Sequence, residues 1–111
     1  MASVPSDPAH PLFEGLARAE VQSLRFERGD TGDNHLLELV LRHDGVLRTF
    51  RFEGVTNLRL QGRFPDVGWL QVFDVTGRQL DRLSIHVLDG EQNEAIEFWA
   101  ASVDEIASSV A

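Results

Sequence analysis

The feature that most restricts the fold of this chain is an alternation of apolar and polar residues that recurs between residues 20 and 100. Residues 35–43 read HLLELVLRH and residues 46–53 read VLRTFRFE. A period of two is typical of a β-strand, whose successive side chains point to opposite faces of a sheet. Asp44 and Gly45 separate the two segments, and this pair favours a tight hairpin turn because both residues tolerate positive φ. The sequence therefore predicts an antiparallel hairpin.

The same pattern recurs along the chain and predicts about seven strands. They cover residues 20–28, 35–43, 46–53, 55–61, 69–75, 81–88 and 94–100. Gly54 interrupts the pattern and predicts a bulge or a sharp bend. Asp89 followed by Gly90 predicts a second hairpin. Residues 69–75 are apolar on both faces, which favours a central strand covered on both sides.

The ends of the chain have a different pattern. Residues 1–11 contain three prolines and predict a disordered tail before a single β-rich domain at residues 12–111. Residues 12–19 have apolar side chains at one-turn spacing and predict a short helix. Residues 102–105 (SVDE) fit a capping box, so we expect a second short helix at the C-terminal end.

These segments together predict the fold class. No strand–helix–strand alternation is present, which disfavours a parallel sheet. We expect a mainly β domain with α+β character only at its margins. Its core would be an antiparallel sheet of about seven strands, strongly curved or closed into a partly open barrel, with short N- and C-terminal helices.

Charge and hydropathy exclude several functional classes. The chain has 18 acidic residues and ten basic ones, which gives a formal net charge of -8. Phosphate backbones repel such a protein, so we expect no nucleic-acid partner. No apolar run approaches the ~20 residues of a membrane span, and residues 1–11 lack the regions of a secretory signal. A cytoplasmic location without membrane contact is therefore expected.

Missing residue types remove further chemistry. Without Cys there is no disulfide, thiol nucleophile or zinc–thiolate site. All ten basic residues are Arg, so the chain has no phosphate-binding or Schiff-base lysine. Lys and Tyr are both encoded by A/T-rich codons, and their joint absence predicts a bacterial source with a GC-rich genome.

Short motifs in the polar segment 29–34 lack the context of the sites they suggest. Residues 30–32 (DTG) match the tripeptide of aspartic proteases, but polar residues flank them where that site needs a buried apolar strand. Residues 28–30 (RGD) match an integrin-recognition tripeptide without any sign of secretion. Asp33 and Asn34 lack the spacing of a calcium-binding loop. We interpret the segment as a polar hairpin loop.

The histidines predict neither a metal site nor a catalytic group. No two of them are spaced as paired metal ligands; they are His10, His35, His43 and His86. Ser84 and His86 share the outer face of a strand, but no nucleophile elbow accompanies them. A hydrolase built on His86 or Asp30 is the third hypothesis. We predict no catalytic residue, no metal and no cofactor.

Acidic residues concentrate toward the C-terminus. Residues 61–111 contain nine acidic residues and three Arg, and no basic residue follows Arg82. An acidic surface that includes an aromatic side chain suits a basic protein partner. The candidate partner-binding residues are Asp89, Glu91, Glu94, Glu97 and Trp99. The alternative is that these residues only keep a small domain in solution.

A resemblance adds to this hypothesis. It is carried by residues 52–55 (FEGV), Leu58, Gly68-Trp69, Asp74, residues 83–87, residues 89–91 (DGE) and residues 96–98 (IEF). This stretch resembles small bacterial all-β proteins without assigned activity, some of them similar to immunity proteins that neutralise bacterial toxins. The resemblance implies no catalytic residue.

The leading hypothesis is a non-enzymatic bacterial domain that binds a protein as an immunity-type inhibitor. The alternative is a small-molecule or lipid carrier that uses the cavity of a curved sheet. Monomer and homodimer both stay open, because an exposed edge strand would allow two copies to pair.

Overall fold

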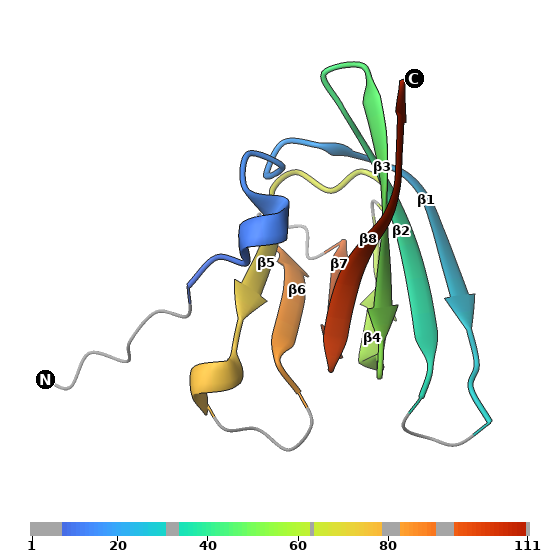
Figure 1. Ribbon diagram of the computed structural model, residues 1–111, viewed down its shortest axis with the longest axis vertical. Helices are drawn as coiled ribbons and strands as arrows, with labels where there is room; N and C mark the ends of the chain where they lie inside the picture. The colour runs from blue at the N-terminus through green and yellow to red at the C-terminus, as the bar shows by residue number, and fades with distance from the viewer. Residues whose placement is uncertain (1–7, 31–33, 63, 79–82, 91–94, 111) are drawn as a thin grey trace, which may run out of the picture.

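Two antiparallel β-sheets of four strands each make up most of the computed structural model (Figure 1). It describes residues 8–30, 34–62, 64–78, 83–90 and 95–110. One sheet has the order β1 (Glu20–Glu27), β2 (Leu36–His43), β3 (Val46–Glu53), β8 (Ser102–Val110). The other has the order β4 (Thr56–Leu60), β7 (Ile96–Ala100), β6 (Ile85–Asp89), β5 (Leu70–Asp74). Two 3-10 turns, η1 (Pro11–Phe13) and η2 (Thr76–Arg78), complete the described elements.

The mainly β, antiparallel character predicted from the sequence is confirmed. The strand number and arrangement need correction, because the described residues form eight strands in two sheets and no closed barrel. The described part of the chain contains no helix that is long and apolar enough to cross a membrane.

The chain passes between the sheets at one shared corner. Gly54, with φ 68°, separates β3 from β4, and Ala101 separates β7 from β8. The Ala101 N–H donates to the Glu53 carbonyl at 2.8 Å, so the two paths bend side by side. The bend predicted at Gly54 is confirmed, because glycine adopts positive φ without a Cβ clash. At this corner β3 leads into β4 and β7 leads into β8, so the chain forms two sheets in place of the predicted single curved sheet.

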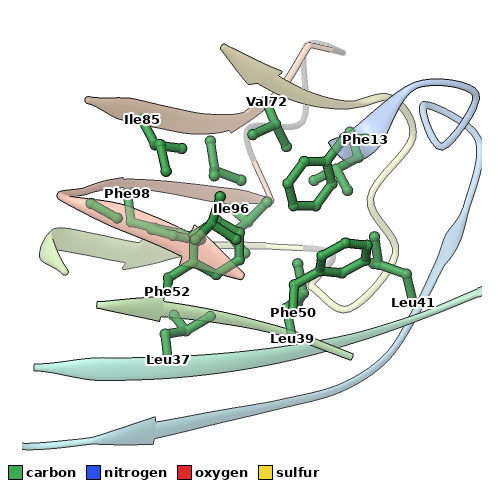
Figure 2. Close-up of a cluster of buried hydrophobic side chains, with 14 of the residues drawn as sticks. Phe13, Leu37, Leu39, Leu41, Phe50, Phe52, Val72, Ile85, Ile96 and Phe98 are labelled. Carbon is green, nitrogen blue, oxygen red and sulfur yellow. The ribbon is translucent and has the colours of Figure 1, made fainter. Parts of the chain in front are cut away.

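The core lies between the two sheets (Figure 2). Alternate apolar residues of both sheets point into it, as the period of two requires. Each of these is at most 5% exposed: Leu37, Leu39, Leu41, Phe50, Phe52, Val72, Ile85, Val87, Ile96 and Phe98. Phe52 of one sheet meets Phe98 of the other edge-on, with ring centroids 4.9 Å apart. Aromatic rings thus join the two layers.

The two predicted hairpins differ. Asp44 and Gly45 form the two-residue turn between β2 and β3, with φ values of 52° and 75°, and this prediction is confirmed. β6 and β7 are antiparallel neighbours, but β6 ends at Asp89 and β7 begins at Ile96. The second connection is therefore longer than a two-residue turn, and its residues 91–94 lie outside the described part.

The predicted C-terminal helix is wrong, because Ser102–Val110 is strand β8. β8 pairs with β3, with Phe50 opposite Glu105 and Thr49 opposite Ala107, so β8 contains one extra residue. This bulge reverses the alternation. Val103 and Val110 therefore face the same side of the sheet although they are seven residues apart, a spacing that also fits two turns of helix.

The predicted N-terminal helix at residues 12–19 is also wrong. Only Pro11–Phe13 forms a 3-10 turn, and Gly15 follows with φ 79°. A positive φ cannot continue a right-handed helix. Apolar side chains of residues 12–19 are nevertheless buried: Phe13 is 7% exposed and Leu16 is 3% exposed.

Strand β5, predicted to be central, lies at the end of its sheet. Residues 8–10, the described end of the expected tail, run along its outer edge. The His10 N–H donates to the Val72 carbonyl, and the Asp74 N–H donates to the Pro8 carbonyl, each at 2.8 Å. The edge of β5 is thereby covered, which accounts for its apolar character without a further strand.

Candidate functional site

The outer face of the β4-β7-β6-β5 sheet carries two of the predicted partner-binding residues, Glu97 and Trp99. Both belong to β7, whose Phe98 and Ala100 point into the core, so their side chains point outward. The strand register sets Trp99 opposite His86 of β6 and Glu97 opposite Arg59 of β4. Directly opposite residues share a face of the sheet. These four side chains therefore form one surface cluster.

Within this cluster, Trp99 is held by His86. The two rings stack with centroids 3.8 Å apart and planes 6° apart. The His86 Nε2–H donates to Glu97 Oε2 at 2.9 Å, because an ionised carboxylate only accepts. One histidine thus fixes both the indole ring and the carboxylate beside it.

Arg59 completes the cluster from the edge strand β4. Its guanidinium pairs with Glu97 Oε1. The Arg59 side chain is 61% exposed and that of Glu97 is 27% exposed. An exposed pair of this kind contributes only ~0–1 kcal/mol, so a competing cation can displace it at low cost.

A bulge in β4 hollows the surface beside the cluster. Thr56 lies opposite Trp99 and Arg59 lies opposite Glu97, so β4 has one more residue than β7 over this stretch. Asn57 takes the left-handed conformation with φ 54°, which asparagine tolerates better than most residues. The resulting groove has a volume of about 480 Å³ and is lined by Asn57, Leu58, Arg59, Glu97 and Trp99.

The other predicted residues do not join this groove. Asp89 is only 4% exposed. Its Oδ1 accepts from the Trp69 N–H and its Oδ2 from the Ala95 N–H, each at 3.2 Å. This carboxylate, at the end of β6, therefore holds the residues just before the starts of β5 and β7. Glu91 and Glu94 lie outside the described residues.

Four residues of the site were not predicted as binding residues: Asn57, Leu58, Arg59 and His86. The alternation did place His86 on an outer face. The order of strands in the sheet decides which residues meet across it, and the sequence carried no signal that β4 pairs with β7. The bulge at Asn57 had no signal either, since asparagine is common in ordinary loops.

Ser84, predicted to share a strand face with the His86 of the hydrolase hypothesis, has another hydrogen-bond partner. The Ser84 hydroxyl donates to the Ala101 carbonyl at the corner between the sheets. Thr31 and Gly32 of the aspartic-protease tripeptide lie outside the described part. Among the residues that the structure places, no group of three His, Asp or Glu is arranged to hold a metal ion.

Three titratable groups with displaced pKa values, Arg48, Asp74 and Glu105, lie away from the groove. A hydrogen bond from Arg48 holds the pKa of Glu105 below its ordinary value, and the same bond raises the pKa of Arg48. Hydrogen bonds from the Thr76 hydroxyl and backbone N–H lower the pKa of Asp74. These pKa shifts arise from hydrogen bonds that hold strands and turns of the fold together.

Comparison with known protein families, with curated proteins and with solved structures found no match for this chain.

Proposed function

We propose that the protein is a non-enzymatic binding protein, and that its groove between β4 and β7 receives a basic side chain from a protein partner. The observation that carries the proposal is the fixed pair of Trp99 and Glu97 beside a groove of about 480 Å³. An aromatic face next to a carboxylate is the arrangement that suits a guanidinium or ammonium group.

The other tryptophan of the chain, Trp69, shows such a cation–π contact within the fold. The Arg18 guanidinium lies over the Trp69 ring, 4.5 Å from its centroid. Such a contact stabilises by ~0.5–1 kcal/mol when exposed and by ~2 kcal/mol when shielded from water. At the groove, the Glu97 carboxylate adds a charged hydrogen bond to the same cation. Because His86 holds both groups already, little ordering entropy is lost on binding.

The charge of the whole chain favours the same class of partner. A net charge of -8 attracts a basic protein over distance and raises the association rate. Neutralising a basic toxin in the bacterial cytoplasm is one function of this kind, and it agrees with the resemblance to immunity proteins. We include that role, the bacterial source and the cytoplasmic location in the proposal.

A capped hexa-arginine peptide tests the groove directly. Titration of the ¹⁵N-labelled protein should shift the indole N–H signal of Trp99 and the amide signals of β4 and β7. Trp99→Leu should weaken binding by about tenfold, measured by calorimetry, because the aromatic face is lost.

The matched control is Trp69→Leu, which removes an indole that is 38% exposed elsewhere on the surface. It should change affinity less than twofold, and both variants keep the net charge. Equal affinity of the wild type and Trp99→Leu would mean that the peptide responds only to net charge, and the proposal would fail.

The carrier hypothesis stays a prediction. The space between the sheets, where it places a ligand, contains aromatic rings in contact: Phe13 and Phe50 have centroids 4.3 Å apart. The groove described above lies on the outer face instead. We therefore propose no second function.

A further inference from the structure

Among the edges that the structure describes, the last residues of β8, 107–110, form one that follows the bulge of this strand and contains neither charge nor proline. β8 ends its sheet, and every residue from Asp104 to Val110 is exposed. Ile106 is the extra residue of the bulge opposite Phe50, and the regular pairing with β3 resumes at Ala107; residues 106–110 contain no charge and no proline. Ile106 is 42% exposed and Val110 is 87% exposed. In Figure 1 this end of β8 lies with the β2–β3 turn, beyond the ends of β5, β6 and β7.

The other three edges carry recognisable protection. Residues 8–10 cover the edge of β5. β4 is short and bulged at Asn57. β1 has a register shift between Val21 and Ser23 and exposed charged side chains. Natural sheets use these same devices to prevent edge-to-edge association. β8 has such devices only at its bulge and at Asp104 and Glu105, and the stretch beyond them, residues 107–110, is an edge of the described structure that remains open to pairing.

We propose that Ile106–Val110 pairs with the same segment of a second copy, in antiparallel orientation, about a two-fold axis at Ser108. This register sets Ile106 opposite Val110 of the second copy. The two-fold axis generates the same pair again, with Val110 opposite Ile106 of the second copy. The register also sets Ala107 opposite Ser109. Ile106, Ser108 and Val110 share one face of β8, so two β-branched pairs flank a serine pair. Such cross-strand pairs are among the favourable ones in sheets.

Charge disfavours a register centred on the acidic residues that precede this segment. An axis at Asp104 would set the two Asp104 residues opposite each other, and like charges directly opposite are destabilising. With the axis at Ser108, the two Asp104 residues lie about 27 Å apart, at ~3.4 Å per residue. That exceeds the ~8 Å screening length at physiological salt. The pairing closes as a dimer because the two surfaces are identical.

β8 of a second copy is a better partner for this edge than the other edge strand of the same sheet, β1. Pairing of β8 with β1 would be head-to-tail and would extend into open chains. A self-pairing edge instead joins two β1-β2-β3-β8 sheets into one eight-stranded sheet. The contact involves few residues, so we expect a buried area at the low end of the range for protein interfaces and therefore a weak dimer. It uses a different sheet from the groove and does not depend on the proposed function.

Sedimentation equilibrium at increasing concentration should give a monomer–dimer equilibrium for the wild type. Ser108→Lys and Ser108→Glu should each weaken dimerisation by about tenfold or more, because equal charges meet at the axis. An equimolar mixture of the two variants should restore dimers, since lysine and glutamate then face each other. Melting curves confirm that both variants are folded, as expected for an exposed position.

A cysteine substitution checks the register independently, since the chain has no Cys. Ser108→Cys should form a disulfide-linked dimer on mild oxidation, because directly opposite Cα atoms lie about 4.5–5.5 Å apart. Ser23→Cys, on the exposed β1 edge, is the matched control and should not crosslink at the same rate. The proposal is overturned by a monomeric wild type at millimolar concentration, by association that extends beyond dimers, or by a charge-swap mixture that stays monomeric.

Discussion

At the residue scale, one ion pair stands out because an arginine occupies a core-facing position. Arg48 of β3 lies opposite Leu41, whose side chain is fully buried. Its guanidinium forms two parallel bonds with Glu105 of β8, at 2.8 and 2.9 Å. It also donates to the Leu12 carbonyl at 3.2 Å. Bidentate geometry makes this the strongest type of arginine–carboxylate pair. Arg48 therefore ties β3, β8 and the N-terminal segment together.

This ion pair predicts a stability change in acid. Arg48 lowers the pKa of Glu105 in the folded state, while unfolding restores it to about 4.5. The stabilisation is therefore complete above that pH and is lost as pH falls through the lower folded value. Glu105→Gln should lower the free energy of unfolding by about 1 kcal/mol at pH 7. The difference should vanish in urea unfolding at acid pH.

The neighbouring substitution Asp104→Asn removes the same charge one residue away, on the other face of β8. It should change stability by less than about 0.5 kcal/mol at pH 7, as exposed substitutions do. A gap between the wild type and Glu105→Gln that persists unchanged at acid pH would contradict the assigned role of Arg48.

At the element scale, the corner between the sheets determines the arrangement of strands. The local alternation predicted β3 and β4 as separate strands but did not indicate that they enter different sheets. Val55, directly after Gly54, is fully buried, and its N–H donates to the His35 carbonyl at 3.1 Å. The bend thus has both a backbone conformation and a buried anchor. A residue with a Cβ is strained there.

Gly54→Ala should therefore lower the free energy of unfolding by about 1–2 kcal/mol, because alanine disfavours φ 68°. Gly77→Ala is the matched control: its φ lies outside the left-handed region and the added Cβ meets no atom within 4 Å. The control should be neutral or slightly stabilising. Equal losses in denaturant unfolding of the two variants would show that the corner does not depend on the glycine conformation.

At the scale of the whole molecule, the N-terminal segment closes one end of the space between the sheets. Phe13 contacts Phe50, and its ring also stacks on Phe52 with centroids 5.9 Å apart. In Figure 2, Phe13 lies between the side chains of the two sheets. Residues 8–10 meanwhile pair with β5. The segment is therefore part of the folded domain.

Phe13→Ala should cost about 3–5 kcal/mol of stability, since it removes a buried ring from the junction of both sheets. Phe26→Ala, at a position that is 41% exposed on β1, should cost about 1 kcal/mol or less. Thermal unfolding of the two variants gives the comparison. If Phe13→Ala unfolds like the wild type, the N-terminal segment contributes nothing to the core.

The candidate site shows how far sequence reasoning reached. Glu97 and Trp99 were predicted from charge and aromatic character, and both line the groove. Asp89 belonged to the same predicted set but is buried, and the two backbone N–H groups that donate to its carboxylate offset the cost of that burial. Composition distinguishes an acidic residue from a neutral one. It does not distinguish a surface carboxylate from one that holds a loop.

The sequence by itself determined the local structure that depends on a period of two and on φ preferences. The β2–β3 hairpin at Asp44 and Gly45 and the bend at Gly54 are properties of neighbouring residues, so local rules predicted them. The tertiary structure alone decided which strands pair, that β8 is a bulged strand and not a helix, and that His86 and Arg59 meet Glu97. Those outcomes depend on contacts between residues far apart in the chain, and pairing with a partner strand overrides a local helical spacing.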